Sequence, residues 1–117
     1  MLRVNSSRSL GGRVELESDE LTLDSGSLIE AKGATGGGTV WVGGGWQGSG
    51  PLRQATTVTM SADSLIDASA TDRGDGGEVV LWSDVHQAGS LTTVNGSLFA
   101  KGGVNGGNGG RIETSGY

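Results

Sequence analysis

Apolar and polar residues alternate over short stretches of this chain, and several of these stretches follow a pair of glycines. Four segments begin with Gly-Gly and continue as a strand pattern, at 11–16, 37–42, 76–81 and 109–114. Alternation with a period of two is typical of a β-strand with one buried face, because successive side chains point to opposite sides. The segments start 26, 39 and 33 residues apart. Such irregular spacing is typical of a solenoid with loop insertions.

Two further strand patterns recur between these starts. One carries Leu or Ile followed by Ala, and a looser one lies before it in each repeat. The first occurs at 27–33, 64–69 and 96–102, and the looser one at 21–23, 58–60 and 91–94. Three short strands per repeat predict one coil of a right-handed parallel β-helix.

We therefore expect an all-β fold of about four coils, forming one domain over residues 1–117. The coils should begin near Gly11, Gly37, Gly76 and Gly109, and the long second repeat should carry a loop insertion at 44–55.

The alternation also assigns side chains to the interior. Equivalent positions in successive repeats hold similar small or branched apolar residues, which predicts inward columns stacked from coil to coil. These columns are Val14, Val40, Val79 and Ile112; Leu16, Val42 and Leu81; Ile29, Ile66 and Leu98; and Ala31, Ala68 and Ala100. The glycine runs 36–38, 74–77 and 106–110 should form one corner of each coil, where positive φ angles favour glycine.

The composition agrees with a thin core. Apolar residues make up 33% of the chain, and it has 24 glycines but one proline, too few for collagen. The net charge is −5 and there is no basic stripe, so we expect no nucleic-acid partner. No apolar run is long enough for membrane insertion. The N-terminal residues lack the apolar core of a signal peptide, so we expect any export signal to lie outside this chain.

Three segments resemble the large filamentous-haemagglutinin-like exoproteins of Gram-negative bacteria. They are 37–48 (GGTVWVGGGWQG), 75–84 (DGGEVVLWSD) and 102–116 (GGVNGGNGGRIETSG). The resemblance implies two-partner secretion, folding outside the cell and a β-helical stalk used in adhesion or biofilm contact. The family's N-terminal secretion domain is not found here, so the resemblance implies a stalk segment.

Few residues suggest chemistry. His86 lies near Asp84 as an acid–base pair would, but a loop position explains it as well. Asp67, Asp72, Asp75 and Asp84 supply oxygens of the kind that bind calcium, while Asp72 and Asp75 also suit a tight turn around Arg73-Gly74. No Ser/His/Asp set is evident. We expect no catalytic residue, no cofactor and no metal site, and hence no enzyme.

The aromatic residues are the stronger candidates for a site. The register predicts one outward column of Glu15, Trp41, Val80 and Glu113, and a second with Glu17, Gly43, Trp82 and Ser115. Trp41, Val80 and Trp82 then form a surface that binds a sugar or a protein. Alternatively, the 44–55 insertion, which contains Trp46, folds over this surface and buries Trp41.

Three functions compete. The first is a structural β-helical segment of a secreted adhesin, located outside the cell or on the bacterial surface, with host or bacterial glycans or proteins as partners. The second is a filament subunit that stacks head-to-tail through open β-helix ends. The third is a carbohydrate-binding module that uses the surface tryptophans.

Overall fold

The computed structural model describes residues 2–3, 9, 11–48 and 54–116, and these residues form an all-β fold. Eleven short strands and one 3-10 turn make up its regular structure. They are β1 (Leu2–Arg3), β2 (Arg13–Leu16), β3 (Glu20–Leu23), β4 (Leu28–Glu30), β5 (Thr39–Val42), η1 (Trp46–Gly48), β6 (Thr57–Met60), β7 (Leu65–Asp67), β8 (Glu78–Trp82), β9 (Leu91–Val94), β10 (Ser97–Phe99) and β11 (Arg111–Ser115).

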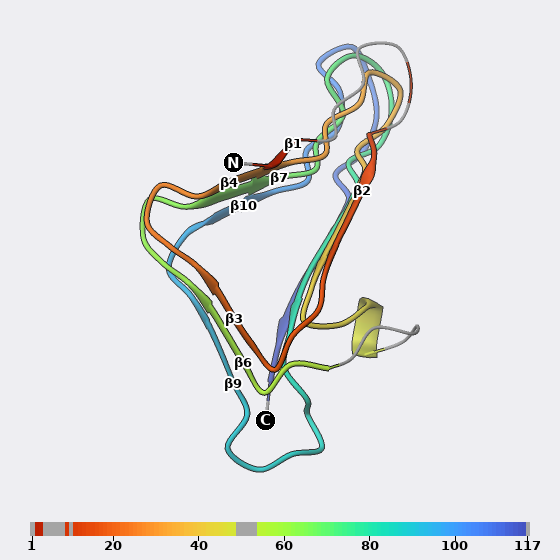
Figure 1. The fold of residues 1–117 in the computed structure, drawn as a ribbon. Helices are drawn as coiled ribbons and strands as arrows, with labels where there is room; N and C mark the ends of the chain where they lie inside the picture. The colour runs from red at the N-terminus through yellow and green to blue at the C-terminus, as the bar shows by residue number, and fades with distance from the viewer. Residues whose placement is uncertain (1, 4–8, 10, 49–53, 117) are drawn as a thin grey trace.

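The strands form three stacked parallel sheets. The first sheet has the order β11-β8-β5-β2, the second β3-β6-β9 and the third β1-β4-β7-β10. Figure 1, viewed along the stack, shows the three sheets as the sides of a triangle, with the chain passing from one side to the next. This arrangement is consistent with a β-helix, in which neighbouring strands of a sheet come from successive coils.

The predicted strands and their registers are confirmed. Val40 pairs with Val14 on one side and with Val79 on the other, and Ile112 pairs with Val79. Ile66 likewise lies between Ile29 and Leu98. Three coils contain all three strands, and β1 and β11 extend the third and first sheets by one strand each.

Burial within each column depends on the coil. Val40, Val42, Ile66, Val79 and Leu81 are fully buried, because each has a neighbour on both sides. Ile112 occupies the same inward column but is 44% exposed, since β11 is the edge strand of its sheet. Val58 and Met60 from β6 complete the centre of the core.

The glycines at the corner have a different role from the one expected. In the Gly-Gly pairs that precede β5, β8 and β11, no residue has a positive φ. Instead, the backbones of successive coils approach too closely for a side chain. A Cβ on Gly37 would lie 1.7 Å from the carbonyl oxygen of Ala68, and one on Gly77 would lie 1.9 Å from that of Gly38. Within the three runs, only Gly74, Gly106 and Gly107 have a positive φ.

The connections between the third and first sheets form a stack of their own, here called the loop arm (residues 31–38, 68–77 and 100–110). It projects from one corner of the triangle in Figure 1. Hydrogen bonds join its layers, as from Gly37 N to Asp75 O and from Gly76 N to Asn108 O. All pairings between named strands are parallel, and one isolated antiparallel bridge, Gly103 to Gly106, lies in this arm.

Candidate functional site

The four residues of the predicted binding or lid-packing surface lie together at the outer face of the first sheet. They are Trp41, Trp46, Val80 and Trp82. Trp41 pairs with Val80 across β5 and β8, and Trp82 follows two positions later on β8. Trp46 lies in η1, which packs against β8 and β11 outside the sheet (Figure 1). The outward column of Glu15, Trp41, Val80 and Glu113 therefore has the predicted register.

The insertion covers Trp82 and Val80. Trp82 is 5% exposed and Val80 is fully buried, although each belongs to one of the two outward-facing columns. The indole nitrogen of Trp82 donates to Oε1 of Gln54 at 3.0 Å. A Cβ on Gly44 or on Gly48 would lie 2.8 or 2.7 Å from the Trp82 ring, so only glycine allows this segment to lie flat on the indole.

Trp41 is partly buried, less completely than Trp82. Its indole nitrogen donates to Oε2 of Glu78 at 2.6 Å. The guanidinium of Arg13 lies 4.2 Å from the centre of the Trp41 ring, which is the geometry of a cation–π contact. Within the insertion that was expected to cover Trp41, residues 49–53 lie outside the described residues.

A second cation–π contact holds η1 on the sheet. The guanidinium of Arg111 lies 4.0 Å from the centre of the Trp46 ring and also pairs with Oε1 of Glu78. The backbone nitrogen of Gln47 donates to Oε1 of Glu113 at 2.6 Å. Glu78 thus accepts from Trp41 and from Arg111, and it links β5 to β11.

This role of Glu78 was not predicted from the sequence. The signal was present in the column one position before the apolar one, where Arg13, Thr39, Glu78 and Arg111 are paired in register. A carboxylate directly opposite a basic residue in an outward column predicts a cross-strand ion pair, and Glu78 is opposite Arg111. The lengths of the intervening loops did not need to be known for that prediction.

The acidic and histidine candidates make bonds to backbone and to asparagine. Oδ1 of Asp84 accepts from the backbone nitrogen of His86 at 2.9 Å, and Oδ1 of Asp67 accepts from that of Ser69 at 3.0 Å. Both are turn contacts between residues two apart. Within the described residues, no group of three or more His, Asp or Glu residues is arranged to hold a metal ion.

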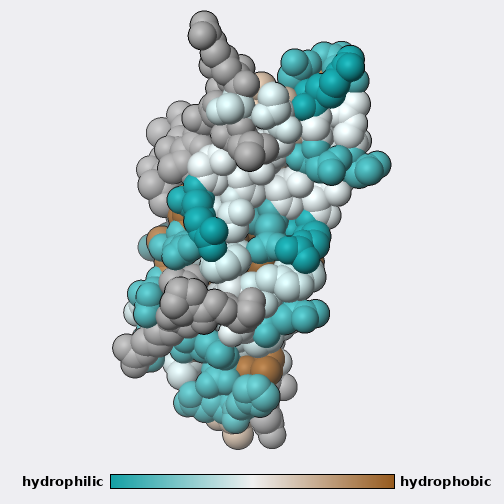
Figure 2. Space-filling view, turned by 90° about the vertical axis from the view of Figure 1, so that its right-hand side faces the viewer, coloured by the Kyte–Doolittle hydropathy of each residue, from teal (hydrophilic) through white to brown (hydrophobic). Residues whose placement is uncertain are grey.

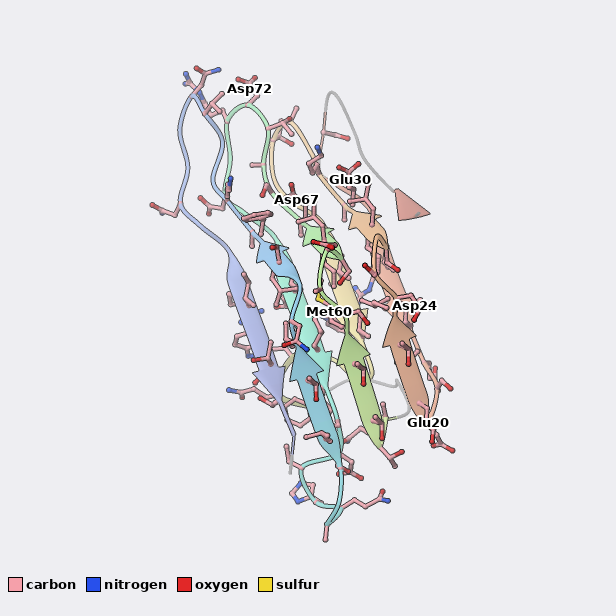
Figure 3. All side chains as sticks on the ribbon, turned by 90° about the vertical axis from the view of Figure 1, so that its left-hand side faces the viewer. Glu20, Asp24, Glu30, Met60, Asp67 and Asp72 are labelled. Atoms are coloured by element: carbon pink, nitrogen blue, oxygen red, sulfur yellow. The ribbon has the colours of Figure 1, made fainter. Side chains whose placement is uncertain are left out.

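Asp72 and Asp75 differ from the expected turn. Their carboxylates accept hydrogen bonds from the next coil. Asp72 accepts from Nδ2 of Asn105 at 2.5 Å, and Asp75 accepts from the backbone nitrogen of Asn108 at 2.9 Å. These side chains therefore connect the layers of the loop arm. Asp72 lies at the far end of this arm in Figure 3.

The described surface has no concave site. No pocket is found among the described residues, and Figure 2 shows a face on which hydrophilic residues are interspersed with residues of intermediate hydropathy and few hydrophobic ones. None of the described residues forms an apolar helix of membrane-spanning length. No protein-family model matches the chain, and the search of curated proteins finds no match.

Proposed function

We propose that this chain is a structural segment of a right-handed parallel β-helical rod in a secreted, adhesin-like bacterial protein. One observation carries the proposal. Similar residues pair in register between successive coils in all three sheets, and at one corner the glycine pairs let the backbones of neighbouring layers lie in direct contact. A fold whose side chains are used in coil-to-coil contacts suits a spacer better than a catalyst. The three quoted motifs support the adhesin assignment by resemblance.

In this proposal the rod acts outside the cell or on the bacterial surface, and it contacts glycans or proteins of a host or of other bacteria. It needs no cofactor and performs no catalysis. The test is attachment by bacteria that display the chain on their surface, measured on epithelial cells and on biofilm. Display of wild type should increase attachment above that of Ile66→Asp, which places a charge in the buried column.

Equal attachment by wild type and Ile66→Asp, at equal amounts on the cell surface, would contradict an adhesive role. Circular dichroism of both purified chains shows whether the substitution has removed the β-structure. A second core variant, Val40→Asp, tests whether the result depends on the fold rather than on one position, because Val40 is also fully buried.

Self-assembly is the second candidate, and the distribution of exposed apolar residues favours it. Among the residues whose burial the structure describes, the exposed large hydrophobic ones are Leu91 (57%), Val104 (84%) and Ile112 (44%), and all three belong to the coil layers nearest β11. The sheets that contain Leu91 and Ile112 end there with the edge strands β9 and β11. In this proposal, a second copy stacks on that end.

Self-assembly makes the melting temperature depend on concentration, because the native chains bind one another. The melting temperature should fall as the chain is diluted, and light scattering should show large particles at the upper concentrations. A melting temperature that is constant on dilution, with monomer throughout, would contradict stacking. The third function, a sugar site on paired tryptophans, has less support because Trp82 is covered.

A further inference from the structure

Asparagine is followed by glycine at three exposed positions. They are Asn95, Asn105 and Asn108, and the last two lie in the loop arm. In such a pair, the backbone nitrogen of glycine attacks the side-chain carbonyl carbon of asparagine. The new C–N bond closes a succinimide ring, and the amide nitrogen leaves as ammonia. Water then opens the ring and gives either aspartate or isoaspartate, so no other reactant is needed.

Two conditions govern this reaction in a folded chain. The asparagine side chain must be free to turn back towards its own backbone, and the glycine nitrogen must not be held in another hydrogen bond. Glycine favours the attack because it has no Cβ beside its nitrogen. The structure therefore distinguishes the three asparagines by the hydrogen bonds around them and by the space around the glycine that follows each one.

Asn105 and Asn108 form a matched pair. Each is followed by two glycines, so their local sequences on that side are identical. The Asn105 amide nitrogen donates to Asp72 at 2.5 Å, and the nitrogen of Gly106 donates to Gly103 O at 3.2 Å. Both reacting groups of Asn105 are thus held.

The reacting groups of Asn108 are not held. Among the described residues, neither the Asn108 side chain nor the nitrogen of Gly109 makes a hydrogen bond. Gly109 also has room around it. A Cβ placed there would come no closer than 3.6 Å to another group, whereas one on Gly96, after Asn95, would lie 2.5 Å from Oγ of Ser64. Movement at Asn95 is therefore more restricted.

We propose that Asn108 is a site of spontaneous deamidation in the folded chain, and that the reaction loosens β11. The backbone nitrogen of Asn108 donates to the carboxylate of Asp75, so the reaction places a new carboxylate close to an existing one. Isoaspartate also lengthens the backbone by one atom just before Gly109.

The backbone after Asn108 tolerates little displacement. Gly110 N donates to Ala100 O at 2.7 Å, and Arg111 N donates to Gly77 O at 2.9 Å. A Cβ on Gly110 would lie 1.8 Å from the oxygen of Gly77, so these backbones are in direct contact. A longer backbone before Gly110 therefore disturbs the two bonds that bring the chain into β11.

The experiment follows ammonia loss at each asparagine by peptide mapping and mass spectrometry, during warm incubation of the purified chain at mildly alkaline pH. In the folded chain, Asn108 should react about tenfold faster than Asn105, because two hydrogen bonds restrain Asn105. In denaturant, the two should react at similar rates, since each is followed by two glycines. Asn108→Gln should remove the fast reaction.

Equal rates at Asn105 and Asn108 in the folded chain, or no reaction at Asn108 while the unfolded chain reacts, would overturn the site. Hydrogen exchange of β11 tests the consequence. The aged wild type should exchange faster at residues 111–115 than aged Asn108→Gln. Unchanged protection in fully deamidated protein would overturn the loosening of β11 and leave the site itself in place. Neither result depends on the adhesin proposal.

Discussion

The indole nitrogen of Trp82 donates a hydrogen bond to the side-chain oxygen of Gln54, and this bond fastens the segment leading into β6 to the outer face of β8. The two residues belong to successive coils. Gly44 and Gly48 lie against the same ring and complete its cover. The outer face of the first sheet thus has a small apolar core of its own, separate from the triangular interior.

Trp82 should therefore contribute more to stability than Trp41. Trp82→Ala removes a buried ring and should lower the free energy of unfolding by about 3–5 kcal/mol. Trp41→Ala is the matched control and should cost clearly less, because Trp41 is half-buried. Urea denaturation of the two variants measures the difference. An equal loss for both would show that the cover over Trp82 adds nothing.

The inward columns should be strongest in the central coils. Ile66→Ala empties a fully buried position and should cost about 2–5 kcal/mol. Ile112→Ala should cost less, because Ile112 has a neighbour on one side only and is 44% exposed. Thermal unfolding of both variants gives the comparison. A larger loss at Ile112 would contradict the placement of β11 at the edge.

Backbone crowding at the glycine corner makes a further prediction. Gly37→Ala places a Cβ 1.7 Å from the oxygen of Ala68 and should cost about 3 kcal/mol or more, because backbone must shift to admit it. Gly26→Ala is the control. Gly26 has φ +84° and open space around a Cβ, so the cost there should be about 1–2 kcal/mol of left-handed strain. Equal stability of the two variants in denaturant would contradict the crowding.

The link through Glu78 is testable by a double-mutant cycle. Glu78→Ala and Arg111→Ala should show a coupling of about 0.2–1 kcal/mol, which is small because Arg111 is exposed and water screens the pair. The coupling should weaken as salt is added. Thr39→Ala in place of Glu78→Ala serves as the control, since no ion pair involves Thr39. If the losses in unfolding free energy of the two single variants simply add in the double variant at low salt, the link is contradicted.

The columns could be predicted from sequence because two signals agree. The Gly-Gly pairs mark the same phase in each coil, and alternation then places Val40 over Val14 and beneath Val79 without knowledge of the loops. The local sequence does not determine whether a glycine is required for a positive φ angle or for a close backbone contact. Whether Gly37 has a positive φ or a close neighbour depends on Ala68, which is distant in sequence and lies in the next layer of the loop arm.

For a related reason, the sequence did not predict which tryptophan the insertion covers. Trp41 and Trp82 are both outward aromatic residues, and alternation treats them alike. The insertion covers Trp82 because residues 44–48 extend far enough beyond β5 to lie against its ring. Gln54 also lies beside this ring and accepts a hydrogen bond from it. Both contacts depend on the three-dimensional course of the insertion, which is longer than the connections at the same place in the other coils, 17–19 and 83–90.

The glycine pairs also determine how a gene for such a chain can change length. Each coil contacts only the coils before and after it, so duplication of a whole coil gives every glycine the same kind of neighbour as before. Recombination that adds part of a coil would bring a side chain to the position beside Ala68 O or Gly38 O, where the structure has no space for one. Descendants of this gene should therefore differ by complete coils, and smaller insertions should be confined to outer segments such as 44–55.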